Sequence, residues 1–201
     1  MVLVEGDNDQ HFIYNLCQRL EFNPVFKVEN CKSVDALFKK LKAELDSDRS
    51  QPLGMVVDAD EDLATRIEQI IKNTKPYFKI EMADFKDNGL IIKPKSEPKF
   101  GVWIWPDNQK NGILEDLYLD LVQDEDLLLE ESKKVIENIK NIEPWRFKPQ
   151  HKSKAIVHTW LAWQINPGSP IGSSLKRSTI NINRPVISNF KFWLQRLYSH
   201  D

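Results

Sequence analysis

The chain has 201 residues, of which 41% are hydrophobic and 10% aromatic, so it can bury the core of one folded domain, and its composition excludes wholesale disorder. Its two cysteines, Cys17 and Cys31, form no CxxC pair and its four histidines have no zinc-ligand spacing, so we expect reduced, buried thiols and no zinc finger. The first apolar run ends at Glu5, too early for a signal peptide or a membrane span, and this favours a cytoplasmic protein.

Charge is unevenly distributed along the chain, although the formal net charge is only −2. Acidic residues dominate from Glu115 to Glu143, whereas the segment from Arg146 to Arg196 contains basic residues and no acid. Such a segment can contact phosphate even in a mildly acidic protein, and a basic face that is merely solvated would have the same composition.

The first 75 residues alternate between apolar runs and segments with helical spacing of their apolar side chains. This alternation predicts an α/β domain with a mainly parallel sheet. In chain order we expect a strand at 1–4, a helix at 7–21, a strand at 24–28, a helix at 33–45 with Ser33 as its N-cap, a strand at 53–58 and a helix at 63–71.

The remainder of the chain predicts further strands followed by helices. Short strands, which could pair as a hairpin, are expected at 78–83 and 89–92, and a continuous apolar run at 99–106 predicts a central strand buried on both faces. Helices are expected from residue 113, at 124–140, at 151–164 and at 187–198, with a loop at 166–174. We therefore predict a single domain over 1–201, with a core at 1–75, additional strands and an acidic loop at 76–122, and a helical part at 123–201.

Acidic residues follow three of the predicted strands. Glu5 follows the first, Asp58 and Asp60 end the third, and Asp107 follows the strand at 99–106. Because the carboxyl ends of parallel strands share one edge of a sheet, these side chains should converge, and their mutual repulsion favours a bound Mg²⁺ or Mn²⁺. Gly6 would let the backbone turn sharply beside such a site. Taken alone, a D-x-D at a strand end is also typical of a helix cap with a solvated neighbour.

These motifs together resemble a known domain. The strand end V-E-G, the following helix–strand–helix unit and the strand ending in DADED resemble the Toprim domain, which topoisomerases, primases and OLD-family nucleases share. The segments GVWIWPDNQKNGILEDLYLDL and KAIVHTWLAWQINPGSPIG resemble a small stand-alone prokaryotic Toprim-like family related to the OLD nucleases. The resemblance implies a Toprim-like central sheet flanked by helices with a helical C-terminal extension. It also implies Mg²⁺- or Mn²⁺-dependent hydrolysis of nucleic acid, DNA more than RNA.

The resemblance also implies roles for individual residues. Carried over position by position, it gives the following metal ligands: Glu5, Asp9, Asp58 and Asp60. A further acid would serve a second metal, with Asp107 as the candidate and Glu115 in reserve, and Lys154 would stabilise the transition state. Glu5 could hold metal or move a proton, and these two roles remain open.

The basic C-terminal segment supplies candidates for phosphate contact and one exclusion. Lys176 and Arg177 follow the loop at 166–174 and are candidates for phosphate binding. That loop lacks the glycine spacing and the lysine of a nucleotide-binding P-loop, so an ATPase of the kind that accompanies OLD nucleases would have to be a separate polypeptide. The tryptophans at 103, 105, 160, 163 and 193 are expected in the core rather than stacked on bases.

Three functions therefore remain open from the sequence. The first is a Mg²⁺-dependent nuclease or nickase, and oligomers are compatible with it. The second is a regulatory module that binds nucleic acid or nucleotide and cleaves only with a partner, such as a separate ATPase, or not at all. The third is an α/β interaction protein whose acidic residues come together by chance. Metal binding and the effect of Asp58→Ala on cleavage would distinguish them.

Overall fold

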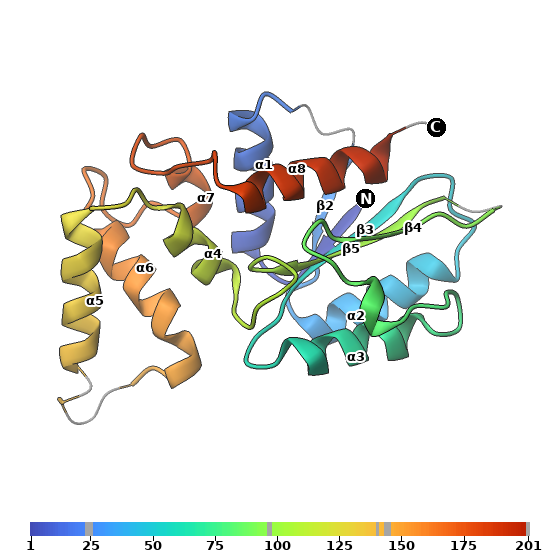
Figure 1. Ribbon diagram of the computed structural model, residues 1–201, viewed down its shortest axis with the longest axis horizontal. Coiled ribbons are helices and arrows are strands. Elements are labelled where there is room, and N and C mark those ends of the chain that lie inside the picture. Colours follow the sequence, from blue (N-terminus) through green and yellow to red (C-terminus); the bar gives the residue numbers. More distant parts are fainter. Residues whose placement is uncertain (23–25, 96–97, 140, 143–145, 200–201) are drawn as a thin grey trace.

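The centre of the protein is a five-stranded, mostly parallel sheet, seen in a computed structural model that describes residues 1–22, 26–95, 98–139, 141–142 and 146–199 (Figure 1). Its strands are β1 (Val2–Val4), β2 (Val28–Asn30), β3 (Leu53–Asp58), β4 (Leu90–Ile92) and β5 (Phe100–Trp105). They lie in the order β2-β1-β3-β5-β4, and only β4 runs antiparallel to its neighbour β5. The predicted α/β class with a mainly parallel sheet is confirmed.

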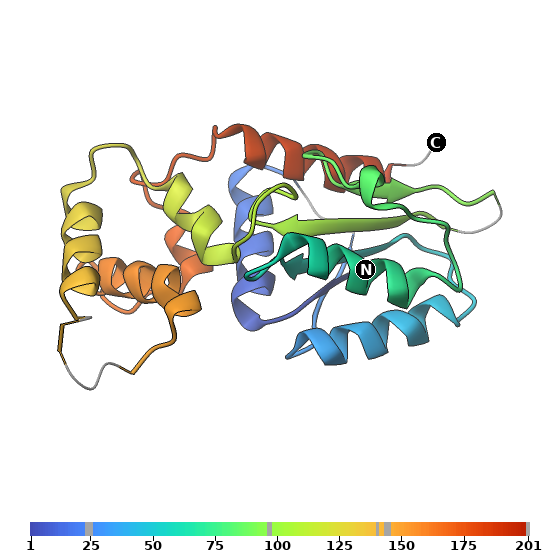
Figure 2. The same ribbon diagram turned by 60° about the horizontal axis from the view of Figure 1, so that its bottom comes forward.

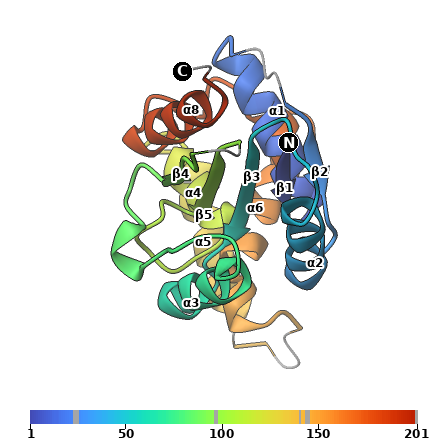
Figure 3. The same ribbon diagram turned by 90° about the vertical axis from the view of Figure 1, so that its right-hand side faces the viewer.

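Helices cover both faces of this sheet. The described helices are α1 (Asp7–Arg19), α2 (Val34–Leu45), α3 (Leu63–Thr74), α4 (Leu114–Leu121), α5 (Leu127–Ile139), α6 (Lys152–Ala162), α7 (Ile171–Ser174) and α8 (Pro185–Tyr198), with 3-10 turns at Met82–Asp84 and Pro149–His151. Helices α1 and α8 lie on one face and α2 and α3 on the other (Figure 3). None of the described helices is long and apolar enough to cross a membrane.

Two apolar cores form because successive strand side chains point to opposite faces of the sheet. Trp103 and Trp105 of β5 pack with Trp193 of α8, whereas Val102 and Ile104 pack on the side of α2 and α3. Four of the five tryptophans expected in the core are fully buried, and Trp163 is 40% exposed. Glycines in the strands let α8 approach closely, because a Cβ at position 101 would lie 3.1 Å from the Leu197 side chain.

Helices α4, α5, α6 and α7 build an extension beyond the end of β5, whereas α8 returns to the face of the sheet (Figure 2). Helices α5 and α6 pack against each other, α4 packs on α6, and α7 packs on α1. Figure 2 shows this helical part on the side toward which β5 runs before the chain enters α4. The predicted helical C-terminal extension is therefore present, and it faces the edge of the sheet at which the parallel strands end.

Three segments differ from the sequence expectation. The strand expected at 24–28 is formed at Val28–Asn30 instead, since pairing begins where Val28 meets Val2, and residues 23–25 lie outside the described part. Residues 78–83 form no strand, because Phe78 and Ile80 are buried in the core beside α3 while the chain turns at Met82–Asp84. The loop expected at 166–174 contains the short helix α7, whose Ile171 is fully buried.

Candidate functional site

The order of the strands creates a crevice between the carboxyl ends of β1 and β3. From β1 the chain proceeds outward to β2, and from β3 it proceeds in the opposite direction to β5, so β1 and β3 flank the point at which the strand order reverses. Ligands of open α/β sheets bind at such points. Glu5 directly follows β1 and Asp58 ends β3. The two are linked, because the backbone N–H of Asp58 donates to Glu5 Oε1 at 3.0 Å.

Two helices direct their first turns, each with a further carboxylate, into the same crevice. Asp9 lies in the first turn of α1 and Glu115 in the first turn of α4, and they are only 6% and 4% exposed. Together with Glu5 and Asp58 they line one pocket of about 360 Å³, which Lys154 of α6 also lines. We call Glu5, Asp9, Asp58 and Glu115 the carboxylate cluster.

Fixed N–H groups hold the members of the carboxylate cluster in place. Asp9 accepts from the Trp105 indole at 2.9 Å and from the backbone N–H of Gly6 at 3.1 Å. Asp58 accepts at 2.9 Å from the backbone N–H of Leu114, the first residue of α4. Glu115 accepts from the Asn8 side chain at 3.3 Å. Asp9 and Glu115 thus lie in the first turns of helices, where the positive end of the helix dipole partly offsets the free-energy cost of burying their charges.

Burial and repulsion by neighbouring acids make three members of the cluster, Glu5, Asp9 and Asp58, weaker acids than usual. Burial, helped by the charges of Glu5 and Glu115, raises the pKa of Asp9 from 3.8 to about 7. Burial first, and then the charges of Asp9 and Glu5, raises the pKa of Asp58 well above its ordinary value. Burial also raises the pKa of Glu5. The cluster therefore favours bound protons, or a cation that replaces them, at neutral pH.

Two cations line the pocket of the carboxylate cluster: Lys32 pairs with Asp7 at 3.0 Å, and Lys154 lies beside a member of the cluster. The Nζ of Lys154 lies 3.7 Å from Glu115 Oε1, and its side chain is about half exposed. It also lines a neighbouring pocket of about 530 Å³, together with Asp58, Asp60 and His151. A flexible ammonium between the two pockets can reach a bound anion and remain close to the carboxylates.

Asp60 is turned away from the carboxylate cluster. Its backbone has a φ of 55°, and its carboxylate pairs with the guanidinium of Arg66 at 2.5 Å. Arg66 is buried and also donates from Nε to the carbonyl oxygen of Asp58 at 2.7 Å. Asp60 therefore lines the neighbouring pocket and not the pocket of Glu5 and Asp9.

Three other candidates from the sequence lie elsewhere. The Asp107 carboxylate caps the turn that follows β5, accepting from the backbone N–H groups of Gln109 and Lys110, and it lines a different pocket. Arg177 holds the loop before α7 by donating to Gln164 and Ser169. Neither Arg177 nor Lys176 lines the pockets beside the carboxylate cluster. The structure thus brings the reserve candidate Glu115 into the cluster in place of Asp107.

Two partners of the site were not among the residues predicted from the sequence. Trp105 was predicted as core, and its indole also donates to Asp9. Arg66 was not considered, although a signal existed: it falls on the apolar face of α3, between Leu63 and Ile70 at helical spacing. A buried guanidinium needs polar partners, and the exposed carboxylate of Asp60 and the carbonyl oxygen of Asp58 provide them.

The chemistry of the carboxylate cluster fits a hard divalent cation. Carboxylate oxygen atoms are the ligands that Mg²⁺ and Mn²⁺ prefer, and a cation would remove the repulsion that raises the pKa values. Within the described ranges, no three His, Cys, Asp or Glu side chains are grouped as a ready-made metal site. Binding an ion would therefore require side-chain rotations that draw the carboxylates together.

Comparison with known proteins gives one match. A family model described as "Protein of unknown function (DUF3226)" matches residues 1–199. Neither the curated proteins nor the solved structures gave a match to the chain. Because the family model covers almost the whole sequence, the chain belongs to the DUF3226 family.

Proposed function

We propose that the protein is a Toprim-like, OLD-related phosphodiesterase that hydrolyses nucleic acid, DNA before RNA, with Mg²⁺ or Mn²⁺. The observation that carries the proposal is the carboxylate cluster, whose four members line one pocket at the β1/β3 crevice together with the paired residues Asp7 and Lys32. Burying so many like charges costs stability unless a ligand compensates for them. A catalytic cation site is the simplest arrangement that would retain them together.

The residues of the pocket would divide the chemistry between them. Glu5, Asp9, Asp58 and Glu115 would hold the cation, which when bound supplies an acidic water and neutralises charge on a phosphate. Lys154 would donate to a non-bridging phosphoryl oxygen, because its half-exposed ammonium reaches both pockets. Glu5 uses Oε1 to accept from the backbone of Asp58, and its raised pKa also suits it to hold a proton during the reaction.

A single cation accounts for the cluster better than two. The acid expected to serve a second metal, Asp107, is engaged in its own turn and pairs with Lys110 at 3.1 Å. Asp60 is engaged by Arg66. With both of these carboxylates committed to other partners, the cluster offers oxygen ligands for one cation once its side chains rotate together.

One observation favours an alternative function, a regulatory module that cleaves only with a partner. Arg66 holds the second acid of the D-x-D motif, Asp60, outside the pocket of Glu5 and Asp9. If the active site needs Asp60, a partner such as a separate ATPase would have to displace Arg66. In that case the isolated protein binds metal and nucleic acid without turnover.

A plasmid-nicking assay with matched variants tests the proposal. The wild type should nick supercoiled DNA only with added Mg²⁺ or Mn²⁺, and Asp58→Asn, which keeps the acceptor for Leu114, should lose at least about 100-fold in rate. Asp35→Asn, an exposed aspartate on α2, is the matched control and should be unchanged. Asp107→Asn should retain its rate within about twofold; a loss like that of Asp58→Asn would restore the two-metal arrangement.

Calorimetry with Mn²⁺ on the same variants separates the remaining outcomes. Metal binding that is abolished by Asp58→Asn, without any nicking by the wild type, would favour the partner-activated module. An absence of Mn²⁺ binding at millimolar concentration would refute both functions and leave an interaction protein. Far-UV circular dichroism of each variant shows whether a loss of activity is a loss of fold.

A further inference from the structure

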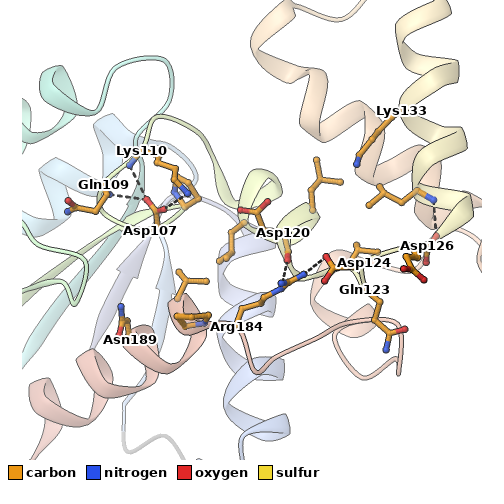
Figure 4. A pocket seen from close by; sticks show the side chains of 18 of the residues that line it. Asp107, Gln109, Lys110, Asp120, Gln123, Asp124, Asp126, Lys133, Arg184 and Asn189 are labelled. Carbon is orange, nitrogen blue, oxygen red and sulfur yellow. Dashed lines mark hydrogen bonds and ion pairs between the residues drawn. The ribbon is translucent and has the colours of Figure 1, made fainter.

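A second cleft lies between the loop after β5, the α4–α5 connection and the start of α8 (Figure 4). Its volume is about 650 Å³, and the residues that line it all differ from those around the carboxylate cluster. A cavity of this size can hold several side chains of a ligand. We call it the Asp120 cleft, after the carboxylate that lies near its centre in Figure 4.

The floor of the Asp120 cleft is apolar and well packed. Leu117, Val122 and Leu129 line it and are almost fully buried, so they present the fixed surface of the protein core. Val186 at the start of α8 adds a partly buried apolar side chain. A ligand with an apolar part that covers this floor therefore gains binding free energy from the burial of apolar surface.

The rim of the Asp120 cleft carries an excess of negative charge. Each cationic side chain in the lining is already paired with a lining carboxylate: Lys110 with Asp107 at 3.1 Å, Lys133 with Glu130 at 2.7 Å, and Arg184 with Asp124 at 2.7 Å. These pairs neutralise one another, and the remaining charged lining residues are all acidic: Asp87, Asp120, Glu125 and Asp126. The cleft should thus repel phosphate and attract a cation.

Of the four remaining carboxylates, Asp120 and Glu125 have no hydrogen bond or ion pair among the described residues, and Asp120 is the one that lies on a helix. Asp120 accepts from Arg184 Nε at 3.1 Å through its backbone oxygen. It lies in the last turn of α4, where the helix carbonyls already carry negative charge and an acid is unfavourable. Partial burial, opposed by Lys110, raises its pKa. Asp120 nonetheless remains exposed to solvent, so its carboxylate is accessible to a ligand cation, which would also offset the unfavourable charge at the end of the helix.

From this arrangement we infer that the Asp120 cleft binds a basic peptide segment of a partner protein, with an arginine directed at Asp120 and an apolar side chain on the floor. A planar guanidinium can donate two parallel hydrogen bonds to one carboxylate, and the Asp120 carboxylate has no other hydrogen-bond partner among the described residues. A divalent ion would need several converging carboxylates, and Asp124 and Asp107 are held in ion pairs. A polyamine would meet the charge but would leave the apolar floor uncovered.

Fluorescence anisotropy with a positional-scanning library of capped octapeptides tests the inference. The library has a central arginine, and two further libraries have citrulline or lysine at that position. With the full chain at physiological salt, we expect the arginine pools to bind best, with apolar residues selected beside the arginine and citrulline weakening binding by about tenfold or more. The Asp120→Asn variant should weaken binding of the best arginine peptide by a similar factor, whereas Asp35→Asn should not change it.

Two further measurements separate a ligand site from a structural role. Asp120→Asn removes an unfavourable charge at a helix C-terminus, so its Tm should equal or exceed that of the wild type while peptide binding falls. Val186→Ser should weaken binding of the same peptide without changing its requirement for arginine. Equal binding of the citrulline peptides, tighter binding of spermidine than of any peptide, or no binding by any pool at millimolar concentration would each overturn the inference.

Discussion

Replacing Asp9 by Asn should change the way in which the stability of the protein depends on pH. Burial raises the pKa of Asp9 from 3.8 to about 7 in the folded protein. A carboxyl whose pKa is raised on folding stabilises the folded state at low pH, and this contribution is lost as the pH rises through the folded pKa. Between about pH 5 and about pH 7 the folded protein holds this proton whereas the unfolded chain has lost it, so the free energy of unfolding falls as the pH rises and levels off above about pH 7. At about 1.4 kcal/mol per pH unit over about two units, the loss is about 3 kcal/mol.

Urea unfolding followed by tryptophan fluorescence, in the presence of a chelator, measures this effect. At about pH 5 the Asn variant should be less stable than the wild type by about 1–3 kcal/mol, because its amide oxygen can accept from only one of Trp105 Nε1 and Gly6 N–H. By about pH 8 the wild type should have lost about 3 kcal/mol more than the variant, so the two curves converge or cross. Asp35→Asn serves as the control, with a curve parallel to that of the wild type.

Parallel curves for the wild type and Asp9→Asn would refute this reasoning. Such a result would mean that Asp9 is ionised in the folded protein throughout this range, so that its burial among Glu5 and Glu115 is not unfavourable. Added Mn²⁺ provides a second check at about pH 8. It should raise the stability of the wild type according to its affinity and stabilise Asp9→Asn less, since the variant lacks one proposed ligand.

Two further predictions concern the cation at the cluster and the packing of α7. Lys154→Met should tighten Mn²⁺ binding by up to about fivefold in calorimetry, because an ammonium 3.7 Å from Glu115 opposes a second cation. The same variant should slow DNA nicking by at least about tenfold, and Lys154→Arg should change both quantities less. Weaker Mn²⁺ binding by Lys154→Met would contradict the placement of this charge. Gly172→Ala should lower the free energy of unfolding by about 1–3 kcal/mol, since its Cβ would lie 2.6 Å from the backbone of His11. Gly168→Ala should lower it by about 1 kcal/mol, because residue 168 has a φ of +74° although its Cβ would meet no atom within 4 Å. Equal losses for the two variants would mean that α7 moves away from α1 to accommodate the Cβ.

The sequence was sufficient for the parts of the fold that depend on local periodicity. The strand run LGMVVD and the helix after Ser33 were predicted because a continuous apolar run and an N-cap are signals that act within a few residues. Glu5 and Asp58 were brought together as predicted, since both end parallel strands that are neighbours in the sheet. A residue at the carboxyl end of a parallel strand must lie at the carboxyl edge of the sheet, so its position in the sequence is enough to place it there.

The direction of a side chain beyond the strand end could not be predicted in this way. Asp107 follows β5 by two residues, as Asp60 follows Asp58, but the turn after β5 uses the Asp107 carboxylate to accept two of its own N–H groups. Asp60 adopts a positive φ and pairs with Gly112 through both backbone groups, so its carboxylate turns toward Arg66. Both outcomes depend on contacts between segments that are far apart in the sequence.

The net charge around the carboxylate cluster matches the charge of the cation proposed for it. Four ionised carboxylates carry −4; Lys154 supplies +1, and the N-termini of α1 and α4 together supply about +1. The pair of Lys32 and Asp7, which also lines the pocket, adds no net charge. The Arg66–Asp60 pair is close to neutral and changes this sum little. About −2 remains, which either two protons or one divalent cation can neutralise. Protons and the cation should therefore compete for the same oxygen atoms. The negative charge that raises the pKa values of Asp9 and Asp58 in the absence of metal is the same charge that would attract Mg²⁺ or Mn²⁺.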